Sequence, residues 1–267
     1  MSAGPVKDAV ARIAADLRAL GVRSGGLLLV HSSLSSMAYV PGGPETVVLG
    51  LLEALGPEGT LLMPALTYER VTAKSPLFDV RRTPSNVGAI PEHFRQRPGT
   101  LRSLHPTHSV CGVGPQTHDM LDDHIQDTTP CGPHSPFRKL RDAQAPNGLG
   151  GQVLMLGCGL RPNTSMHAIE ELAMPPYLFN GPLDYVLVQA GGVRIEKTYT
   201  THGFEGWTQR YDRVAQVLEA PHLVQGPVLQ ATGHLIEARA LWERVLSVMA
   251  HDPLYFVDRR PILIQRR

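Results

Sequence analysis

The sequence of 267 residues has almost no excess of charge of either sign, since 25 Lys and Arg stand against 24 Asp and Glu. Nucleic acids and anionic membranes are bound through basic patches, and a net charge of +1 does not provide that signature. The longest apolar runs are also far shorter than the roughly 18 residues that a membrane-spanning helix needs. We therefore expect neither a nucleic-acid partner nor a membrane partner.

Cysteine is scarce, with three residues and no CxxC pair. This composition disfavours both a disulfide framework and a structural zinc site. The first residues lack the basic segment and apolar segment of a signal peptide, so a cytoplasmic location is expected. The motifs GxSxG, HExxH and GxGxxG are absent as well, which disfavours the α/β-hydrolase, zincin and Rossmann classes.

The apolar residues that are present follow the rhythm of an α/β protein. Hydrophobic residues make up 42% of the chain and charged residues 18%, which is typical of a packed core. Helical periodicity over residues 6–20 is followed by a continuous apolar run at 26–31, which is typical of a strand buried on both faces. We expect a mainly parallel central sheet flanked by helices. No repeat or composition break divides the chain, so one domain over 1–267 is expected.

Similar patterns predict the remaining elements. Further helices are expected at 46–55, 87–97, 164–173, 207–218 and 237–250. Further strands are expected at 60–64, 108–113 and 153–157, and a hairpin at 185–189 and 193–199. Residues 66–86 have few periodic apolar positions and are interpreted as a long functional loop.

The strongest functional pattern follows the strand at 153–157, where a glycine-containing loop enters a helix that Asn163 or Thr164 caps. Thr164, His167 and Glu170 lie three residues apart on one helical face. A hydroxyl, an imidazole and a carboxylate therefore converge, and an imidazole held by a carboxylate is a suitable general base. The alternative is structural: Thr164 caps, His167 packs and Glu170 is solvated.

Two other segments carry polar groups that suit an anionic ligand. The hydroxyls of Ser32, Ser33 and Ser35 follow the strand at 26–31 and favour an anion cradle, although a serine-rich surface loop has the same composition. Residues 102–109 hold one cation, two histidines and three hydroxyls. They indicate a phosphate contact or a metal site, but no neighbouring carboxylate completes a set of metal ligands. In the structural alternative, these histidines bond backbone carbonyls.

The segment 200–207 places His202 and Glu205 in a glycine-flanked loop beside aromatic residues. Here the alternative is an ordinary loop with an exposed glutamate. The chain has twelve histidines, and five of them fall inside these patterns. They are His31, His105, His108, His167 and His202.

The ordered set of motifs resembles the aminoglycoside 3-N-acetyltransferase family, whose fold differs from that of the GNAT acetyltransferases. The matching pieces are LLVHSSLSSM (28–37), GTLLMPALTY (59–68), RSLHPTHSVCGVGP (102–115), GPHSPFRKL (132–140), GQVLMLGCGLRPNTSMHAIEE (151–171), HGFEGW (202–207) and DPLYFV (252–257). They cover most of the chain in the expected order. The resemblance therefore implies an antibiotic N-acetyltransferase-like fold, an acetyl-CoA cosubstrate and a role in antibiotic resistance.

The resemblance also implies roles for single residues. His167 is the expected general base for direct acetyl transfer, Glu205 the acidic residue that orients it, and Thr164 the hydroxyl beside it; Glu170 becomes a supporting residue. Residues expected at the cofactor are Ser32, Ser33, Leu34, Ser35, Arg102, His105 and Ser109. Residues expected at the acceptor are Tyr68, Glu69, Asp79, Glu170 and Glu171. No metal is expected, and the assembly is expected to be a monomer or homodimer.

The acceptor is less sharply defined than the donor. Aminoglycosides are polycations, whereas the chain is close to neutral and its segment 66–86 carries Arg and Lys beside its two acids. Three alternatives stay open: an acyl-CoA-dependent acyltransferase acting on a different amine, a non-catalytic CoA-binding module, and a histidine-based metal hydrolase.

Overall fold

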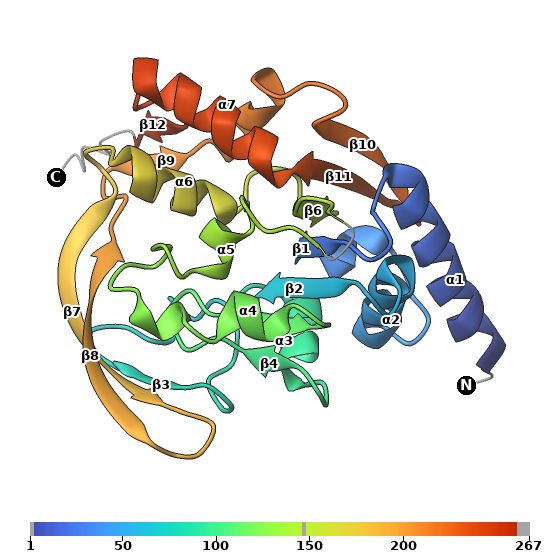
Figure 1. Cartoon of the computed structure of the whole chain (residues 1–267), viewed down its shortest axis with the longest axis horizontal. Helices are drawn as coiled ribbons and strands as arrows, with labels where there is room; N and C mark the ends of the chain where they lie inside the picture. The colour runs from blue at the N-terminus through green and yellow to red at the C-terminus, as the bar shows by residue number, and fades with distance from the viewer. Residues whose placement is uncertain (1–2, 146–147, 261–267) are drawn as a thin grey trace, which may run out of the picture.

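The computed structural model describes residues 3–145 and 148–260, so residues 1–2, 146–147 and 261–267 of the expected domain lie outside it. Its centre is a seven-stranded sheet in the order β10-β11-β6-β1-β2-β5-β4 (Figure 1). These strands are β1 (Leu27–Ser32), β2 (Thr60–Pro64), β4 (Leu101–Arg102), β5 (Val110–Val113), β6 (Gln152–Leu156), β10 (Leu223–Val228) and β11 (Ala231–Glu237).

The three middle strands of this sheet are parallel. β1 pairs with β2 on one side and with β6 on the other in parallel register, whereas β5 and β11 join the outer edges of this trio antiparallel. The α/β class with a parallel sheet centre is therefore confirmed. Parallel pairing is limited to the trio, whose carboxyl ends all lie at one edge of the sheet, which is where α/β proteins form their sites.

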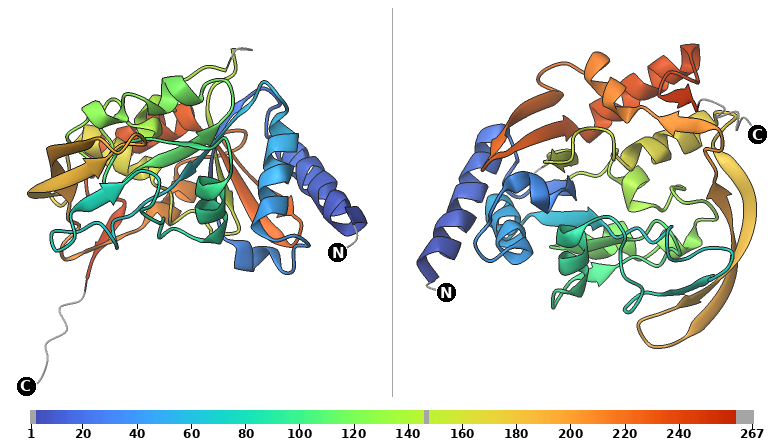
Figure 2. Two further views of the ribbon diagram at one scale, coloured as in Figure 1. Left: turned by 90° about the horizontal axis from the view of Figure 1, so that it is seen from below. Right: turned by 180° about the vertical axis from the view of Figure 1, so that it is seen from behind.

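Alternate side chains of each central strand pack against different helices, because successive residues of a strand point to opposite faces. Leu28 and Val30 of β1 belong to the core that includes residues of α1 to α3, and Leu27 and Leu29 to the core that includes residues of α4 to α7. Figure 2 gives two further views of how these helices lie around the sheet. The helices are α1 (Ala3–Leu20), α2 (Pro44–Leu55), α3 (Ala89–Gln96), α4 (Thr117–Leu121), α5 (Pro136–Lys139), α6 (Ser165–Ala173) and α7 (Ala238–His251). None of the described helices is long and apolar enough to cross a membrane.

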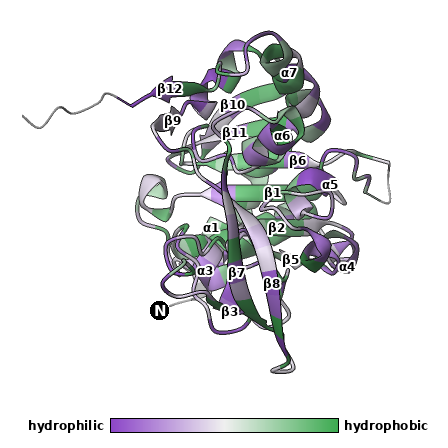
Figure 3. Ribbon diagram, turned by 90° about the vertical axis from the view of Figure 1, so that its left-hand side faces the viewer, coloured by the Kyte–Doolittle hydropathy of each residue, from purple (hydrophilic) through white to green (hydrophobic). Residues whose placement is uncertain are grey.

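A long hairpin stands beside the central sheet. It consists of β7 (Phe179–Val188) and β8 (Arg194–His202), so the hairpin expected at 185–199 is confirmed and extends further. β3 (Leu77–Asp79), within the expected loop 66–86, adds a parallel third strand. Figure 3 shows mixed hydropathy along β7 and β8, in contrast to the apolar strands of the central sheet. The hairpin has its own small core, which includes Phe78, Tyr185 and Tyr199.

The prediction of a helix at 207–218 is wrong. The segment forms β9 (Trp207–Gln209), which pairs antiparallel with β12 (Val257–Arg259), and then the 3-10 helix η3 (Tyr211–Gln216). Tyr211, Val214 and Leu218 are buried at spacings of three and four, which an α-helix and a 3-10 turn satisfy alike. The partner strand β12 lies about 50 residues further along the chain, where a local pattern cannot detect it.

Truncation of Leu29 is expected to destabilise the fold through the sheet centre. Leu29 is fully buried and pairs with Leu62 on one side and Val153 on the other. Leu29→Ala is expected to lower the free energy of unfolding by about 2–5 kcal/mol, measured by urea denaturation. Leu77→Ala is the control, since Leu77 is 46% exposed on β3. Equal losses for the two variants would contradict this account of the core.

Candidate active site

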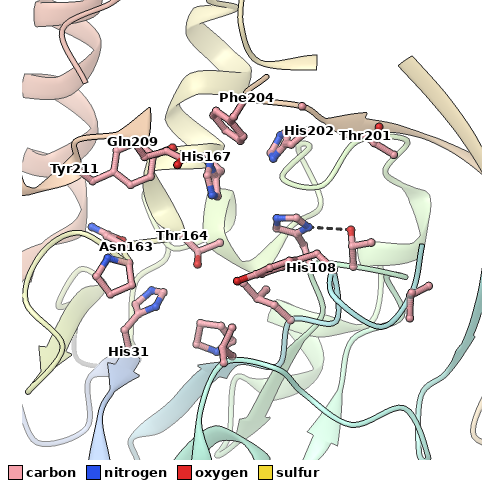
Figure 4. A pocket seen from close by; sticks show the side chains of 18 of the residues that line it. His31, His108, Asn163, Thr164, His167, Thr201, His202, Phe204, Gln209 and Tyr211 are labelled. Atoms are coloured by element: carbon pink, nitrogen blue, oxygen red, sulfur yellow. Dashed lines mark hydrogen bonds between the residues drawn. The ribbon is translucent and has the colours of Figure 1, made fainter. Parts of the chain in front are cut away.

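A cavity of about 930 Å³ opens at the carboxyl ends of the three parallel strands. His31 and Ser32 line it at the end of β1, Pro64 at the end of β2, and Cys158 just after β6. The amino-terminal part of α6 and the hairpin strands β7 and β8 form its other walls. Its volume lies in the range of small-molecule and cofactor sites, and Figure 4 shows its histidines arranged around an open centre.

His167 faces this pocket from the first turn of α6 and is held from behind by a buried carboxylate. Its Nδ1 lies 3.2 Å from Oε2 of Glu170 and 2.9 Å from the hydroxyl oxygen of Tyr211. The Tyr211 hydroxyl donates to the same Oε2 at 2.7 Å, and the Tyr177 hydroxyl donates to Oε1 at 2.8 Å. Burial beside Glu170 raises the pKa of both tyrosines, so they stay protonated donors. Nδ1 of His167 therefore carries the proton, which leaves the Nε2 lone pair for the pocket.

The structure pairs His167 with Glu170 and not with Glu205, which corrects the carboxylate favoured by the resemblance. Glu205 is exposed in the turn after β8 and forms no side-chain hydrogen bond or ion pair within the described part of the chain. Glu170 is fully buried, and its i,i+3 spacing from His167 on α6 brings the two side chains together. The i,i+3 spacing therefore predicted the contact that the structure shows between these two side chains.

Three polar side chains lie on the strand side of His167. Thr164 lines the pocket at the start of α6, as expected, but makes no capping hydrogen bond through its side chain. Asn163 caps instead, since its Oδ1 accepts from the Ser165 N–H at 3.1 Å, and its Nδ2 is buried without a partner. Nε2 of His31 is likewise buried without a partner. Burial lowers the pKa of His31 to about 3, so the ring is neutral.

A second histidine–carboxylate pair, which local patterns missed, lies on the hairpin side. Nε2 of His202 lies 2.7 Å from Oε1 of Glu171. Glu171 also accepts hydrogen bonds from the Thr129 hydroxyl at 2.5 Å and the Cys131 N–H at 2.8 Å. Burial raises the pKa of Glu171 to about 7 and lowers that of His202. Glu171 was expected to touch the acceptor directly, but in this geometry His202 stands between its carboxylate and the pocket.

Further histidines pack around the two pairs. The His108 ring lies 6.0 Å from that of His167 and 5.4 Å from that of His202, measured between centroids. His105 stacks on His124 behind it at 4.9 Å. Burial lowers the pKa of His105, His108 and His124, so this cluster is uncharged at neutral pH. No group of three or more metal-ligating side chains with suitable geometry exists among the described residues.

Arg102, His105 and Ser109 were expected at the cofactor, but the structure places them behind the pocket lining. Arg102 donates to the Ser109 hydroxyl at 2.9 Å and to the carbonyls of Thr83 and Ala65 at 2.6 and 2.8 Å. The Ser109 hydroxyl donates to the same Ala65 carbonyl at 2.8 Å. Nδ1 of His105 accepts from two backbone N–H groups of its own loop. These side chains hold the backbone that carries His108 and the segment 65–83.

The serine segment divides into two parts. Ser32 lines the pocket, and its hydroxyl is buried without a partner. Ser33, Leu34 and Ser35 follow at the start of the 3-10 helix η1 (Leu34–Met37), outside the lining. The Ser33 hydroxyl contacts that of Ser35 at 3.1 Å. Of the serine hydroxyls expected at the cofactor, the structure therefore places that of Ser32 in a pocket-lining residue and those of Ser33 and Ser35 outside the lining.

The acceptor side is nearly free of negative charge. Tyr68 lines the pocket as expected, but Glu69 is exposed outside the lining, and Asp79 accepts hydrogen bonds from the N–H groups of its own turn. Among the described residues that line the pocket, the charged side chains other than histidine are Arg161 and Arg260, and no carboxylate is present.

The chain is similar to a known protein family over most of its length. The family model described as "Aminoglycoside 3-N-acetyltransferase" matches residues 29–250. The chain is 33% identical over 251 residues to aminoglycoside N(3)-acetyltransferase IV of a Salmonella species, which covers 92% of this chain and 89% of that protein. It is 36% identical over 190 residues to aminoglycoside N(3)-acetyltransferase VIII of Streptomyces fradiae, a match that spans 65% of this chain and 63% of that protein.

Solved structures of aminoglycoside acetyltransferases superpose on most of this chain. The apoenzyme of aminoglycoside acetyltransferase AAC(3)-IVa superposes with a TM-score of 0.76 at 30% identity, covering 92% of this chain and 90% of that chain. A histidine-to-alanine variant of that enzyme in complex with a gentamicin superposes with a TM-score of 0.78 at 31% identity, again covering 92% of this chain and 90% of that chain. The binary complex of AAC-IIIb with CoASH gives 0.77 at 27% identity, covering 93% and 97%.

Arg102→Met tests whether this arginine supports the pocket wall or binds the cofactor. Removal of the guanidinium takes a donor away from the Thr83 carbonyl, the Ala65 carbonyl and the Ser109 hydroxyl, and a buried group left unsatisfied costs about 1–3 kcal/mol. We expect a clear fall in the unfolding midpoint, measured calorimetrically, with CoA affinity retained in the folded protein. Arg161→Met is the matched control, because Arg161 is an exposed residue of the lining, and little change in its midpoint is expected. An unchanged midpoint for Arg102→Met with lost CoA binding would reverse this assignment.

Proposed function

Because this chain belongs to the aminoglycoside 3-N-acetyltransferase family, we propose that it transfers the acetyl group of acetyl-CoA to the 3-amino group of an aminoglycoside. Members of this family are acyltransferases. The proposal for this chain rests on one observation. His167 is held by Glu170, and the Nε2 lone pair of His167 faces a cavity of about 930 Å³. One structure similar to this one is a complex with CoASH and another a complex with a gentamicin, and we carry both kinds of ligand over as the proposed donor and acceptor.

His167 acts as the general base in the proposed reaction. An alkylamine with a pKa of about 10 is mostly an ammonium ion at pH 7 and cannot attack a thioester in that form. Once the amine is neutral, its nitrogen attacks the acetyl carbonyl while Nε2 of His167 takes the proton that the nitrogen loses. Glu170 stabilises the imidazolium through Nδ1 and fixes its orientation. The same proton then passes to the sulfur of the departing CoA thiolate.

Uncharged hydrogen-bond donors on the strand side of His167 are suited to stabilise the negative charge that develops on the thioester during the reaction. Nδ2 of Asn163 and Nε2 of His31 are buried, unpartnered and part of pocket-lining residues. Thr164 lies between them and His167 at the amino-terminal end of α6, where the helix dipole is positive (Figure 4). We assign these three side chains to the tetrahedral oxyanion and the thiolate, because fixed donors in a water-poor site stabilise such charge.

Direct transfer fits the site better than an acetyl-enzyme. Cys158 is the cysteine of the pocket lining, and burial raises the pKa of its thiol to about 11. At neutral pH it is almost entirely protonated and therefore a poor nucleophile. All three cysteines are free thiols. We place the reaction in the cytoplasm, where thiols stay reduced.

A second candidate acceptor is favoured by one observation. The described lining residues include two arginines and no carboxylate, whereas a polycation is best bound by carboxylates. An acyl-CoA-dependent acyltransferase acting on an amine of lower charge would fit this lining.

The proposed function is tested by thiol release from acetyl-CoA with a panel of aminoglycosides and simple amines. We expect release with at least one aminoglycoside, and a loss of about 10²–10⁴-fold in kcat for His167→Ala, the usual contribution of a general base. Circular dichroism checks that the variant is folded. Release with simple amines alone would favour the second acceptor class. CoA binding without turnover of any amine would instead identify a binding module.

The carboxylate partner of His167 is tested by a pair of matched variants. Glu170→Gln removes the buried charge that stabilises the imidazolium, and we expect kcat to fall by about tenfold or more, since loss of a partner that holds a catalytic histidine is costly. Glu205→Gln changes an exposed residue and is expected to leave kcat within about twofold. Steady-state kinetics with one active aminoglycoside measures both. The reverse ranking would restore Glu205 as the orienting residue.

A further inference from the structure

The proposed reaction has two protons to remove from the acceptor nitrogen, and His167 accounts for one of them. An alkylammonium must lose a proton before its nitrogen has a lone pair, and the nitrogen loses a second proton as the amide forms. With an amine pKa of about 10, roughly one molecule in a thousand is already neutral at pH 7. A second proton acceptor in the pocket would let the enzyme use the abundant ammonium form.

Within the described part of the chain, two pocket-lining histidines connect the cavity to buried carboxylates. Among the described residues, no carboxylate lines the cavity. Glu170 and Glu171 lie directly behind it, 0% and 8% exposed, and each is in contact with the ring of a pocket-lining histidine. An ammonium therefore meets the charge of Glu170 through His167 and that of Glu171 through His202.

The geometry of His202 suits proton acceptance. Glu171 accepts from Nε2 of His202 at 2.7 Å, so the lone pair of the neutral ring lies on Nδ1. Nδ1 is buried and has no hydrogen-bond partner, and the side chain is only 6% exposed. The His202 ring centroid lies 5.2 Å from that of His167. Figure 4 shows the two rings side by side at the same end of the cavity.

The His202–Glu171 pair carries the negative charge of one carboxylate, and the positive charge of Arg138 lowers the pKa of that carboxylate and so opposes the effect of burial. Glu171 and His167 face it from α6, and His108 faces it from the loop before β5. Phe179 of β7 and Phe204 after β8 cover the remaining sides with uncharged rings. Burial raises the pKa of Glu171 to about 7, so this carboxylate gains proton affinity near neutral pH.

We propose that His202, held by Glu171, is a second catalytic base that takes the first proton from the acceptor ammonium, an inference that rests on the proposed function. That proton moves from the ammonium nitrogen to Nδ1 of His202, and the Nε2 proton shifts toward Glu171. The neutral amine then attacks the thioester. The second proton goes to Nε2 of His167 and on to the CoA sulfur as the C–S bond breaks. The products are the amide, CoASH and one proton, which the His202–Glu171 pair releases to solvent.

The experiment compares pH profiles of kcat/KM for the parent enzyme and His202→Asn, with an aminoglycoside that the parent acetylates. The Asn side chain keeps a hydrogen-bond acceptor but cannot take a proton, so the variant depends on free amine, which rises tenfold per pH unit. Above pH 7 the His202–Glu171 pair of the parent is deprotonated and can accept a proton from the ammonium form. The kcat/KM of the parent divided by that of His202→Asn is expected to fall about tenfold per pH unit from pH 7 up to the amine pKa. The same ratio for His167→Ala is not expected to fall in this way.

Two further variants make the outcome decisive. Glu171→Gln removes the carboxylate that stabilises the protonated His202 ring and so lowers the proton affinity of Nδ1. Its kcat/KM is expected to approach that of the parent with rising pH in the same way, even if His202→Asn does not fold. Phe179→Leu disturbs packing on the His202 ring but keeps both bases, so its ratio to the parent is expected to be independent of pH. A constant ratio for both His202→Asn and Glu171→Gln would overturn the inference. A parent that acetylates no amine would instead refute the proposed function, before any variant is compared.

Discussion

Two adjacent carboxylates buried in α6 constrain much of the surrounding structure. Removing a carboxylate from water is costly unless hydrogen-bond donors replace the lost solvation. Glu170 takes its donors from Tyr177, Tyr211 and His167, and Glu171 from His202 and the segment 129–131. Consecutive helix residues point about 100° apart. The two carboxylates therefore organise different walls of one cavity and fix η3, the end of β8 and the 129–131 turn around a single helix.

Much of the fold is predictable because its central strands are buried on both faces. The continuous apolar runs at 26–31, 60–64 and 153–157 leave little choice besides a parallel, helix-covered sheet, and the helices between them have clear periodicity. The His167–Glu170 contact is predictable for a similar reason, because both residues lie in one helix whose geometry fixes their distance. Glu205 was favoured by motif resemblance, which carries no such geometric constraint.

The remaining features depend on contacts between distant segments. His202 and Glu171 are 31 residues apart and meet only after the hairpin packs beside α6. Arg102 has the composition of a phosphate ligand, yet backbone carbonyls from 65–83 occupy its guanidinium. Trp207–Gln209 becomes a strand because β12 provides a partner. In each case the local pattern was compatible with two structures, and tertiary packing selected one of them.

The separate core of the hairpin has a consequence for how this enzyme can diverge. Residues such as Phe78, Tyr185 and Tyr199 form a hydrophobic cluster under the β3-β7-β8 sheet that is separate from the two clusters of the central sheet. The wall proposed to meet the acceptor therefore packs largely on residues other than those that hold His31 and the loop leading to Thr164. Its inward-facing side chains can be exchanged during evolution while the donor side keeps its geometry, so a single scaffold can acquire new amine specificities without rebuilding its chemistry.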